Sequence, residues 1–230
     1  MTARLLAWSV HAYTASGALL AFLGVLAVFH GRYRDAFLLM VAATIVDATD
    51  GVFARMARVK EVTPHFDGAR LDDIVDYLTF AFLPILLLFH AGDLPAGWGW
   101  LAVAAVLLSS AYGFAAADAK TSDNFFTGFP SYWNIVALYL HAGGMPPAIN
   151  AAVLLGLAAM VFVRIRYVYP SRTPVLRGLT TAMGVLWGVM IIALILQLPD
   201  VSRTLLVASL FFPVYYSGLS LALNGRRVTA

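Results

Sequence analysis

Long apolar stretches, separated by short polar breaks, follow one another along the whole chain. A helix that crosses a bilayer needs about 20 mostly apolar residues. Eight stretches approach that length: 12–30, 36–56, 70–91, 96–117, 130–144, 147–166, 177–198 and 203–223. Glycine and proline mark the breaks, for example at 92–95 and 143–147. The pattern predicts an all-α, polytopic membrane helix bundle of about eight spans, with residues 1–230 forming one domain.

The first residues carry a weaker signal. Residues 2–10 are predicted to form a short helix that lies at the membrane interface, with Arg4 and Trp8 as its anchors. The start of the chain lacks a strongly basic region, and apolar spans recur further along, so we do not expect a cleavable signal peptide.

Composition supports a membrane location and excludes other classes. The 230 residues are 61% hydrophobic and 12% charged, whereas soluble domains carry about 25% charged residues. The chain has no cysteine, which excludes disulfides and thiolate metal sites. The net charge is only +3, and no basic stripe alternates with aromatic residues, so we do not expect a nucleic-acid partner.

The basic residues predict the orientation. With eight spans, both termini lie on one side of the membrane, and that side holds 12 of the 15 Lys and Arg residues. The positive-inside rule makes this side cytoplasmic.

Four aspartates stand at the predicted cytoplasmic ends of the second and third spans. Asp47 and Asp50 share one helical face, and Asp72 and Asp76, four residues apart, share another. Acidic residues in apolar helices usually mark function. Four ionised carboxylates that converge need cations, and oxygen ligands favour Mg²⁺, Mn²⁺ or Ca²⁺. Paired ions of this kind, about 3.5–4 Å apart, suit displacement at phosphorus.

Neighbouring residues extend this pattern. Small residues at Gly51, Ala54 and Gly68 let a flat ligand or another helix approach closely, although Gly51 alone is also typical of helix packing. Arg55 can pair with a phosphate. Two further acids are left outside the metal set. Asp73 points about 100° away from Asp72, and Asp67 is interpreted as an acid that begins a helix.

The run Asp47-x-x-Asp50-Gly51-x-x-Ala54-Arg55, followed by Gly68-x-x-x-Asp72-x-x-x-Asp76, resembles the signature of the CDP-alcohol phosphotransferase family. The long segment 56–67 resembles the bacterial phosphatidylcholine synthase branch of that family. Three other segments also resemble that branch: His11 with 14–17, Pro170-Ser-Arg172, and the loop 118–134.

The resemblance implies transfer of the phosphatidyl group of CDP-diacylglycerol to choline, with release of CMP. It implies that Asp47, Asp50, Asp72 and Asp76 hold two divalent cations, Mg or Mn, and that Asp76 also accepts the proton of the attacking hydroxyl. Gly51, Ala54, Arg55 and Gly68 would bind the nucleotide. The core site helices would lie at about 36–91. The resemblance further implies a bacterial inner membrane, membrane lipid as a partner, and a homodimer.

Choline carries a fixed positive charge, which aromatic faces and a carboxylate can bind. Candidates around the fourth and fifth spans are Tyr112, Asp118, Asp123, Phe126, Tyr132 and Trp133. The same aromatic residues are also typical of an interfacial belt. Three basic residues after the sixth span could hold the lipid phosphate, or could set topology and attract anionic lipid: Arg164, Arg166 and Arg172.

Other functions remain open on the residues alone. Serine, inositol phosphate or glycerol phosphate could be the acceptor, and CDP-choline with diacylglycerol would use the same metal site. A cation transporter is an alternative of another class. Transporter sites usually lie near the bilayer midplane on broken helices, whereas these aspartates lie toward one end of their spans.

Overall fold

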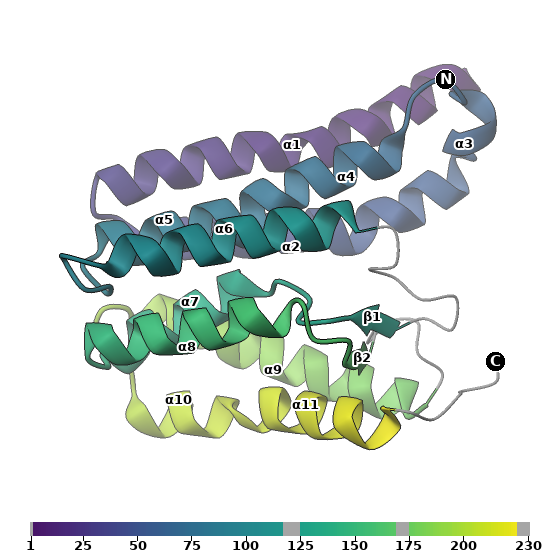
Figure 1. Ribbon diagram of the computed structural model, residues 1–230. Helices are drawn as coiled ribbons and strands as arrows, with labels where there is room; N and C mark the ends of the chain where they lie inside the picture. The colour runs from purple at the N-terminus through teal and green to yellow at the C-terminus, as the bar shows by residue number, and fades with distance from the viewer. Residues whose placement is uncertain (1, 117–124, 169–174, 225–230) are drawn as a thin grey trace.

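The computed structural model describes residues 2–116, 125–168 and 175–224. The predicted all-α architecture is confirmed, because the described chain is almost entirely helical (Figure 1). Its elements are α1 (Ala3–Phe29), α2 (Tyr33–Met56), α3 (Val59–Val62), α4 (Gly68–Asp76), the π-helix η1 (Tyr77–Phe82), α5 (Leu83–His90), α6 (Gly99–Ala115), β1 (Phe125–Thr127), α7 (Trp133–Gly143), α8 (Pro147–Met160), β2 (Arg166–Val168), α9 (Arg177–Gln197), α10 (Arg203–Ser209) and α11 (Phe211–Leu223).

Helices occupy all eight predicted ranges. Four of them are long and apolar enough to cross a membrane: α1, α2, α9 and the run Arg203–Leu223 formed by α10 and α11. The helices α6 and α8 are apolar but shorter. The chain is therefore a membrane protein by length and composition, and the number of eight crossings stays a prediction.

The separate interfacial helix at 2–10 is wrong. Helix α1 runs without a break from Ala3, and the Thr2 side chain accepts a hydrogen bond from the Leu5 amide at its start. Ala7 and Val10 are buried in a small cluster with Ala57 and Val59. The first turns of α1 are therefore packed against α3 and form one helix with the rest of α1.

Two irregular elements were not predicted. The strands β1 and β2 pair antiparallel, with Phe125 opposite Val168 and Thr127 opposite Arg166. The π-helix η1 begins directly after Asp76 and lies between α4 and α5. π-Helical turns are rare and occur frequently at functional sites.

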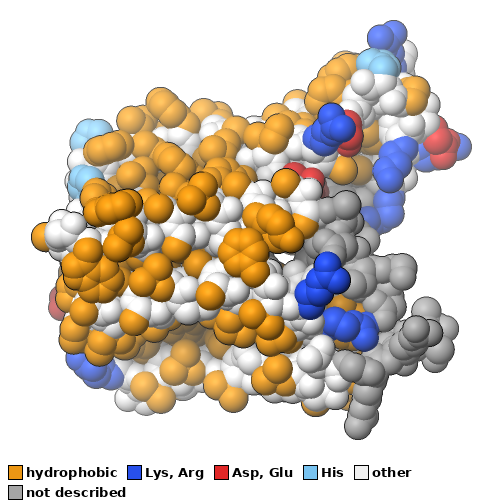
Figure 2. Space-filling model, viewed as in Figure 1, with side chains coloured by type: hydrophobic (Ala, Val, Ile, Leu, Met, Phe, Trp, Pro, Cys, Tyr) orange, Lys and Arg blue, Asp and Glu red, His pale blue; other side chains and the backbone are white. Residues whose placement is uncertain are grey.

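The helices run back and forth, and α1 begins at the end of the bundle where α11 ends (Figure 1). The same end carries α3, β1 and β2, while the α1–α2, α5–α6 and α7–α8 turns lie at the opposite end. Figure 2 shows that hydrophobic side chains cover most of the visible face, whereas Lys and Arg side chains gather near β1, β2 and the start of α1.

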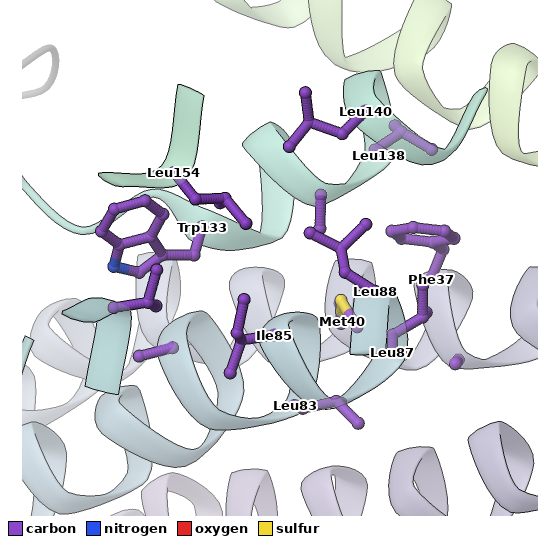
Figure 3. Close-up of a cluster of buried hydrophobic side chains, with 14 of the residues drawn as sticks. Phe37, Met40, Leu83, Ile85, Leu87, Leu88, Trp133, Leu138, Leu140 and Leu154 are labelled. Atoms are coloured by element: carbon purple, nitrogen blue, oxygen red, sulfur yellow. The ribbon is translucent and has the colours of Figure 1, made fainter. Parts of the chain in front are cut away.

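Helix α5 lies at the centre of the hydrophobic core. Leu83, Ile85, Leu87 and Leu88 are almost completely buried. In Figure 3 they lie among side chains from neighbouring helices, including Phe37 of α2, Trp133 of α7 and Leu154 of α8. Each fully buried side chain of this size contributes about 1.5–3 kcal/mol. Burial therefore holds α5 in the core, and η1 and α4, which precede it in the chain, extend from it toward the other end of the bundle.

Glycines on α1 allow α4 and α5 to come close. A Cβ atom on Gly17 would lie 2.5 Å from Cγ1 of Val75, and one on Gly24 would lie 2.5 Å from Cδ2 of Leu83. These glycines are seven residues apart and therefore lie on the same face of α1. Close approach through small residues is typical of membrane helix pairs. The position of α4 thus depends on the absence of side chains at this face.

We expect Gly17→Ala to destabilise the protein by about 1–3 kcal/mol, because the added methyl overpacks against Val75, whose branched side chain is stiff in a helix. Gly156→Ala is the matched control, since nothing lies within 4 Å of a Cβ at this helical glycine. The measurement is the temperature at which the detergent-solubilised protein loses its monodisperse size-exclusion peak. An unchanged temperature for Gly17→Ala would contradict the close approach.

Candidate functional site

Carboxylates from α2 and α4 converge at one end of the bundle. Asp47, Asp50 and Asp72 each have an oxygen atom within 4.8 Å of the others. Asp50 is buried, and its Oδ2 accepts a hydrogen bond of 2.7 Å from Oγ1 of Thr14 on α1. The predicted convergence of α2 and α4 is thus seen for three of the four predicted metal ligands.

The fourth predicted ligand, Asp76, lies at the same place. It lines a cavity of about 180 Å³ together with Asp47 and Asp72. Asp73 also lines this cavity, although its direction on an ideal helix separated it from Asp72. Asp67 is the N-cap of α4 and accepts hydrogen bonds from the amides of Ala69 and Arg70, as predicted for an acid that begins a helix.

Aromatic rings and a short loop form the other walls of the cavity. Four aspartates line the cavity: Asp47, Asp72, Asp73 and Asp76. The other lining residues are Phe80, Gly113, Phe114, Thr127, Phe129, Pro130, Ser131, Tyr132 and Val161. They come from η1, from the end of α6, from the segment 127–132 and from the end of α8. The cavity is therefore acidic where α2 and α4 line it and mainly apolar or aromatic where the other elements line it.

The segment 127–132 is held in place by backbone contacts. The Gly128 amide donates to the Ile165 carbonyl at 2.9 Å, and the Phe129 amide donates to the Met160 carbonyl at 3.1 Å. Gly128 has a φ of +77°, and a Cβ there would collide with the Val161 carbonyl oxygen. Glycine is required here both for the backbone conformation and for the close approach. The segment 127–132 thus becomes a fixed wall of the cavity.

A second, more open cavity of about 420 Å³ lies beside the first and shares Asp73 and Phe114 with it. Its other lining residues come from α4, η1 and α6: Arg70, Ile74, Tyr77, Leu78, Ala111 and Ala115. The Tyr77 hydroxyl donates to the Leu107 carbonyl at 3.2 Å and joins η1 to α6. We call this second cavity the apolar groove.

The acidic cluster could hold a metal ion. Carboxylates this close together repel one another unless cations balance their charge. All of the candidate ligand atoms are hard oxygen atoms, which suit Mg²⁺, Mn²⁺ or Ca²⁺ rather than zinc or copper. Thr14 adds a hydrogen bond that orients Asp50, as outer-shell groups do for metal ligands. The donor set therefore fits a hard divalent cation.

The predicted nucleotide residues lie on the same two helices but do not line the cavity. Gly51 and Arg55 are adjacent, with the Arg55 side chain 3.5 Å from a Cβ placed on Gly51. Ala54 packs against the small cluster of α1 and α3. Gly68 is close to His11, whose Nε2 lies 3.0 Å from Thr63 Oγ1. These residues are close to the acids along α2 and α4 but lie outside the cavity that the segment 127–132 lines.

Only one of the predicted choline residues whose side chains the structure describes lines the cavity. Tyr132 lines the cavity, but Tyr112 is 54% exposed and packs against Phe162. Trp133 is 1% exposed, its indole donates to Ser110 at 2.7 Å, and it does not line the cavity. Asp118 and Asp123 lie outside the described residues, and so does the side chain of Phe126.

The two predicted lipid-phosphate residues that the structure describes lie in and just before the strand β2. Arg164 is exposed after α8. The Arg166 guanidinium lies over the Phe125 ring, 4.3 Å from its centroid. Arg172 lies outside the described residues. Neither Arg164 nor Arg166 lines the two cavities described above.

Sequence reasoning missed four residues of the site: Thr14, Asp73, Phe114 and Phe129. Thr14 stood in a segment that resembled the family but carried no chemistry of its own. Phe114 and Phe129 gave no local signal, because aromatic residues at span ends are common in membrane proteins. Only the Asp72-Asp73 pair, an additional acid beside a predicted ligand, could have drawn attention to Asp73.

Comparisons with known proteins identify the family of the chain. No family model matches the chain. The chain is 37% identical to the phosphatidylcholine synthase of Pseudomonas aeruginosa, over 96% of this chain and 92% of that protein. It is 37% identical to the phosphatidylcholine synthase of Legionella pneumophila over 93% of this chain and 87% of the relative. For that of Borreliella burgdorferi, the identity is 33% over 95% of this chain and 93% of the relative. The resemblance noted in the sequence is confirmed, and the chain belongs to the phosphatidylcholine synthase family.

Proposed function

We propose that this chain transfers the phosphatidyl group of CDP-diacylglycerol to choline and releases CMP. The observation that supports this most directly is the convergence of Asp47, Asp50 and Asp72 in a member of the phosphatidylcholine synthase family. Asp76 lines the acidic cavity together with Asp47 and Asp72, so it adds a carboxylate to the site.

The cofactors in this proposal are two divalent cations, Mg or Mn, held by Asp47, Asp50, Asp72 and Asp76. When bound, such ions supply positive charge that stabilises the phosphate of the departing CMP. Thr14 keeps the buried Asp50 carboxylate in one orientation through its hydrogen bond of 2.7 Å. The arrangement supports the enzyme over the transporter alternative, because the acids lie toward the ends of α2 and α4 beside a walled cavity.

Asp76 is proposed as the general base. A choline hydroxyl is a weak nucleophile at neutral pH, and a carboxylate within hydrogen-bond reach accelerates its attack by accepting the proton. The Asp76 backbone begins the transition into η1. Arg55 is proposed to contact the nucleotide phosphate, and Gly51, Ala54 and Gly68 to border the nucleoside.

The site is proposed to face the cytoplasm of a bacterial inner membrane. Nucleotide and choline would then reach the acids from water, while the acyl chains stay in the bilayer. The apolar groove suits the acyl chains, because it adjoins the acidic cavity and is lined mainly by apolar side chains of α4, η1 and α6. The homodimer implied by the resemblance stays a prediction.

A different acceptor alcohol is the nearest alternative. Inositol phosphate and glycerol phosphate carry negative charge and would favour basic residues in the acceptor pocket. The cavity is instead lined by four aspartates and four aromatic rings, with no Lys or Arg among its described lining residues. This lining favours a cationic acceptor over a phosphorylated one.

We expect Asp76→Asn to reduce CMP release by about 10²–10⁴-fold, the usual contribution of a general base. The assay uses purified protein, CDP-diacylglycerol and labelled choline. Asp67→Asn is the matched control on α4, because Asn also caps helices and Asp67 does not line the cavity. Turnover in Asp76→Asn equal to that of the control would contradict the assignment of the base.

Removal of divalent ions should abolish the formation of phosphatidylcholine, and addition of Mg²⁺ or Mn²⁺ should restore it. The same ions should raise the unfolding temperature of the wild-type protein, because they bind only the folded state. Asp50→Asn should lose most of this stabilisation. Activity that survives exhaustive chelation would contradict the metal part of the proposal.

We expect Ala111→Trp to fill the apolar groove and to raise the KM for long-chain CDP-diacylglycerol at least about tenfold, through overpacking against the bound chain. A CDP-diacylglycerol with very short acyl chains should be affected much less. Ala152→Trp on α8 is the control, since Ala152 is also exposed but does not line the groove. Equal effects on both lipids would place the acyl chains elsewhere.

A further inference from the structure

The lining of the cavity consists of carboxylates and of apolar or aromatic side chains. Asp47, Asp72 and Asp76 account for one side under the proposed function. The remaining carboxylate in the lining is Asp73, which lies one residue further along α4 than Asp72. Asp73 lines both the cavity and the apolar groove, and Phe114 is the other residue that does so. An acid and an aromatic ring therefore meet at the boundary between the two cavities.

Two more aromatic side chains line the cavity from the segment 127–132. Phe129 packs edge-on against the buried Trp133, with ring centroids 4.9 Å apart. Tyr132 contacts Tyr216 of α11, with ring centroids 6.2 Å apart. The hydrogen bonds of Gly128 to Ile165, just before β2, and of Phe129 to Met160, at the end of α8, hold the backbone of this segment. Both rings thus pack against other aromatic side chains of the protein.

Resting on the proposed function, we propose that Asp73, Phe114, Phe129 and Tyr132 form the wall that recognises the trimethylammonium group of choline and sets acceptor specificity. A quaternary ammonium has no hydrogen-bond donor on nitrogen, so a site can recognise it only through its charge and its apolar methyl surface. Aromatic faces and one carboxylate meet both demands. Phe80 also lines the cavity but is 8% exposed and belongs to the core side of η1.

This assignment gives Trp133 a different role from the one that the sequence indicated. Its indole is anchored to Ser110 of α6 and supports the Phe129 ring. Trp133 is therefore a positioning residue, and it joins the loop wall to α6. Tyr112, which is exposed beside Phe162, has no part in the wall.

The test compares choline with 3,3-dimethylbutan-1-ol, a neutral alcohol of nearly the same shape. Both are assayed with purified protein and CDP-diacylglycerol. Phe129→Leu should raise the choline KM at least about fivefold, because it removes one desolvated cation–π contact. The KM for CDP-diacylglycerol should change less than twofold, and the KM for the neutral alcohol should rise by a smaller factor than that for choline, because the neutral alcohol loses only apolar contact. Phe162→Leu is the matched control, since that ring is exposed and outside the cavity.

Asp73→Asn keeps the size of the side chain and removes only its charge, so it tests the proposal even if Phe129→Leu fails to fold. It should lower the preference for choline over the neutral alcohol at least about fivefold. Unchanged preference in Asp73→Asn and Phe129→Leu, with activity retained, would overturn the inference. Equal loss with both alcohols in Asp73→Asn would also overturn it, and would assign Asp73 to metal binding. If the wild-type protein forms no lipid from choline, the proposed function itself fails, and the two failures are thereby distinguished.

Discussion

Electrostatic repulsion among carboxylates at the ends of α2 and α4 is the constraint on which the site depends. Asp47, Asp50 and Asp72 have oxygen atoms within 4.8 Å of one another, and ionised groups at this separation are unfavourable without compensating charge. Asp50 is buried, which increases the cost of its charge. Such a cluster is tolerated when cations bind it and when hydrogen bonds such as that from Thr14 orient its members. The proposed function therefore rests on a cluster whose charge repulsion opposes folding.

The helix packing keeps this cluster together. Helix α1 touches both α2 and α4, and its glycine face lets Val75 and Leu83 approach closely. Helix α1 also supplies Thr14 to Asp50 and His11 to the neighbourhood of Gly68. A helix without any proposed catalytic residue thus sets the distance between the two helices that carry the acids. The buried side chains of α5 hold the other end of the same unit in the core.

The second half of the chain completes the site from the opposite side. The end of α8 and the strand pair β1–β2 fix the segment 127–132, and this segment brings Phe129 and Tyr132 into the lining of the cavity that the acids also line. Phe129 and Tyr132 are therefore carried by a different part of the chain from the proposed metal ligands. This separation would allow acceptor specificity to change through the wall while the metal ligands stay the same.

The sequence by itself determined the membrane class, the eight helical ranges and the four aspartates that belong together. These features are set by local rules: the length of apolar stretches, the 3.6-residue helical repeat and the rarity of acids in apolar helices. Only the tertiary structure decided which aromatic residues reach the site. Trp133 and Phe129 lie close in sequence, but one is buried behind the other because β-pairing and the contacts with α8 fix the loop. The packing of α4 against α1 likewise decided that Asp73 lines the cavity. Such contacts join residues far apart in the chain, and no local pattern encodes them.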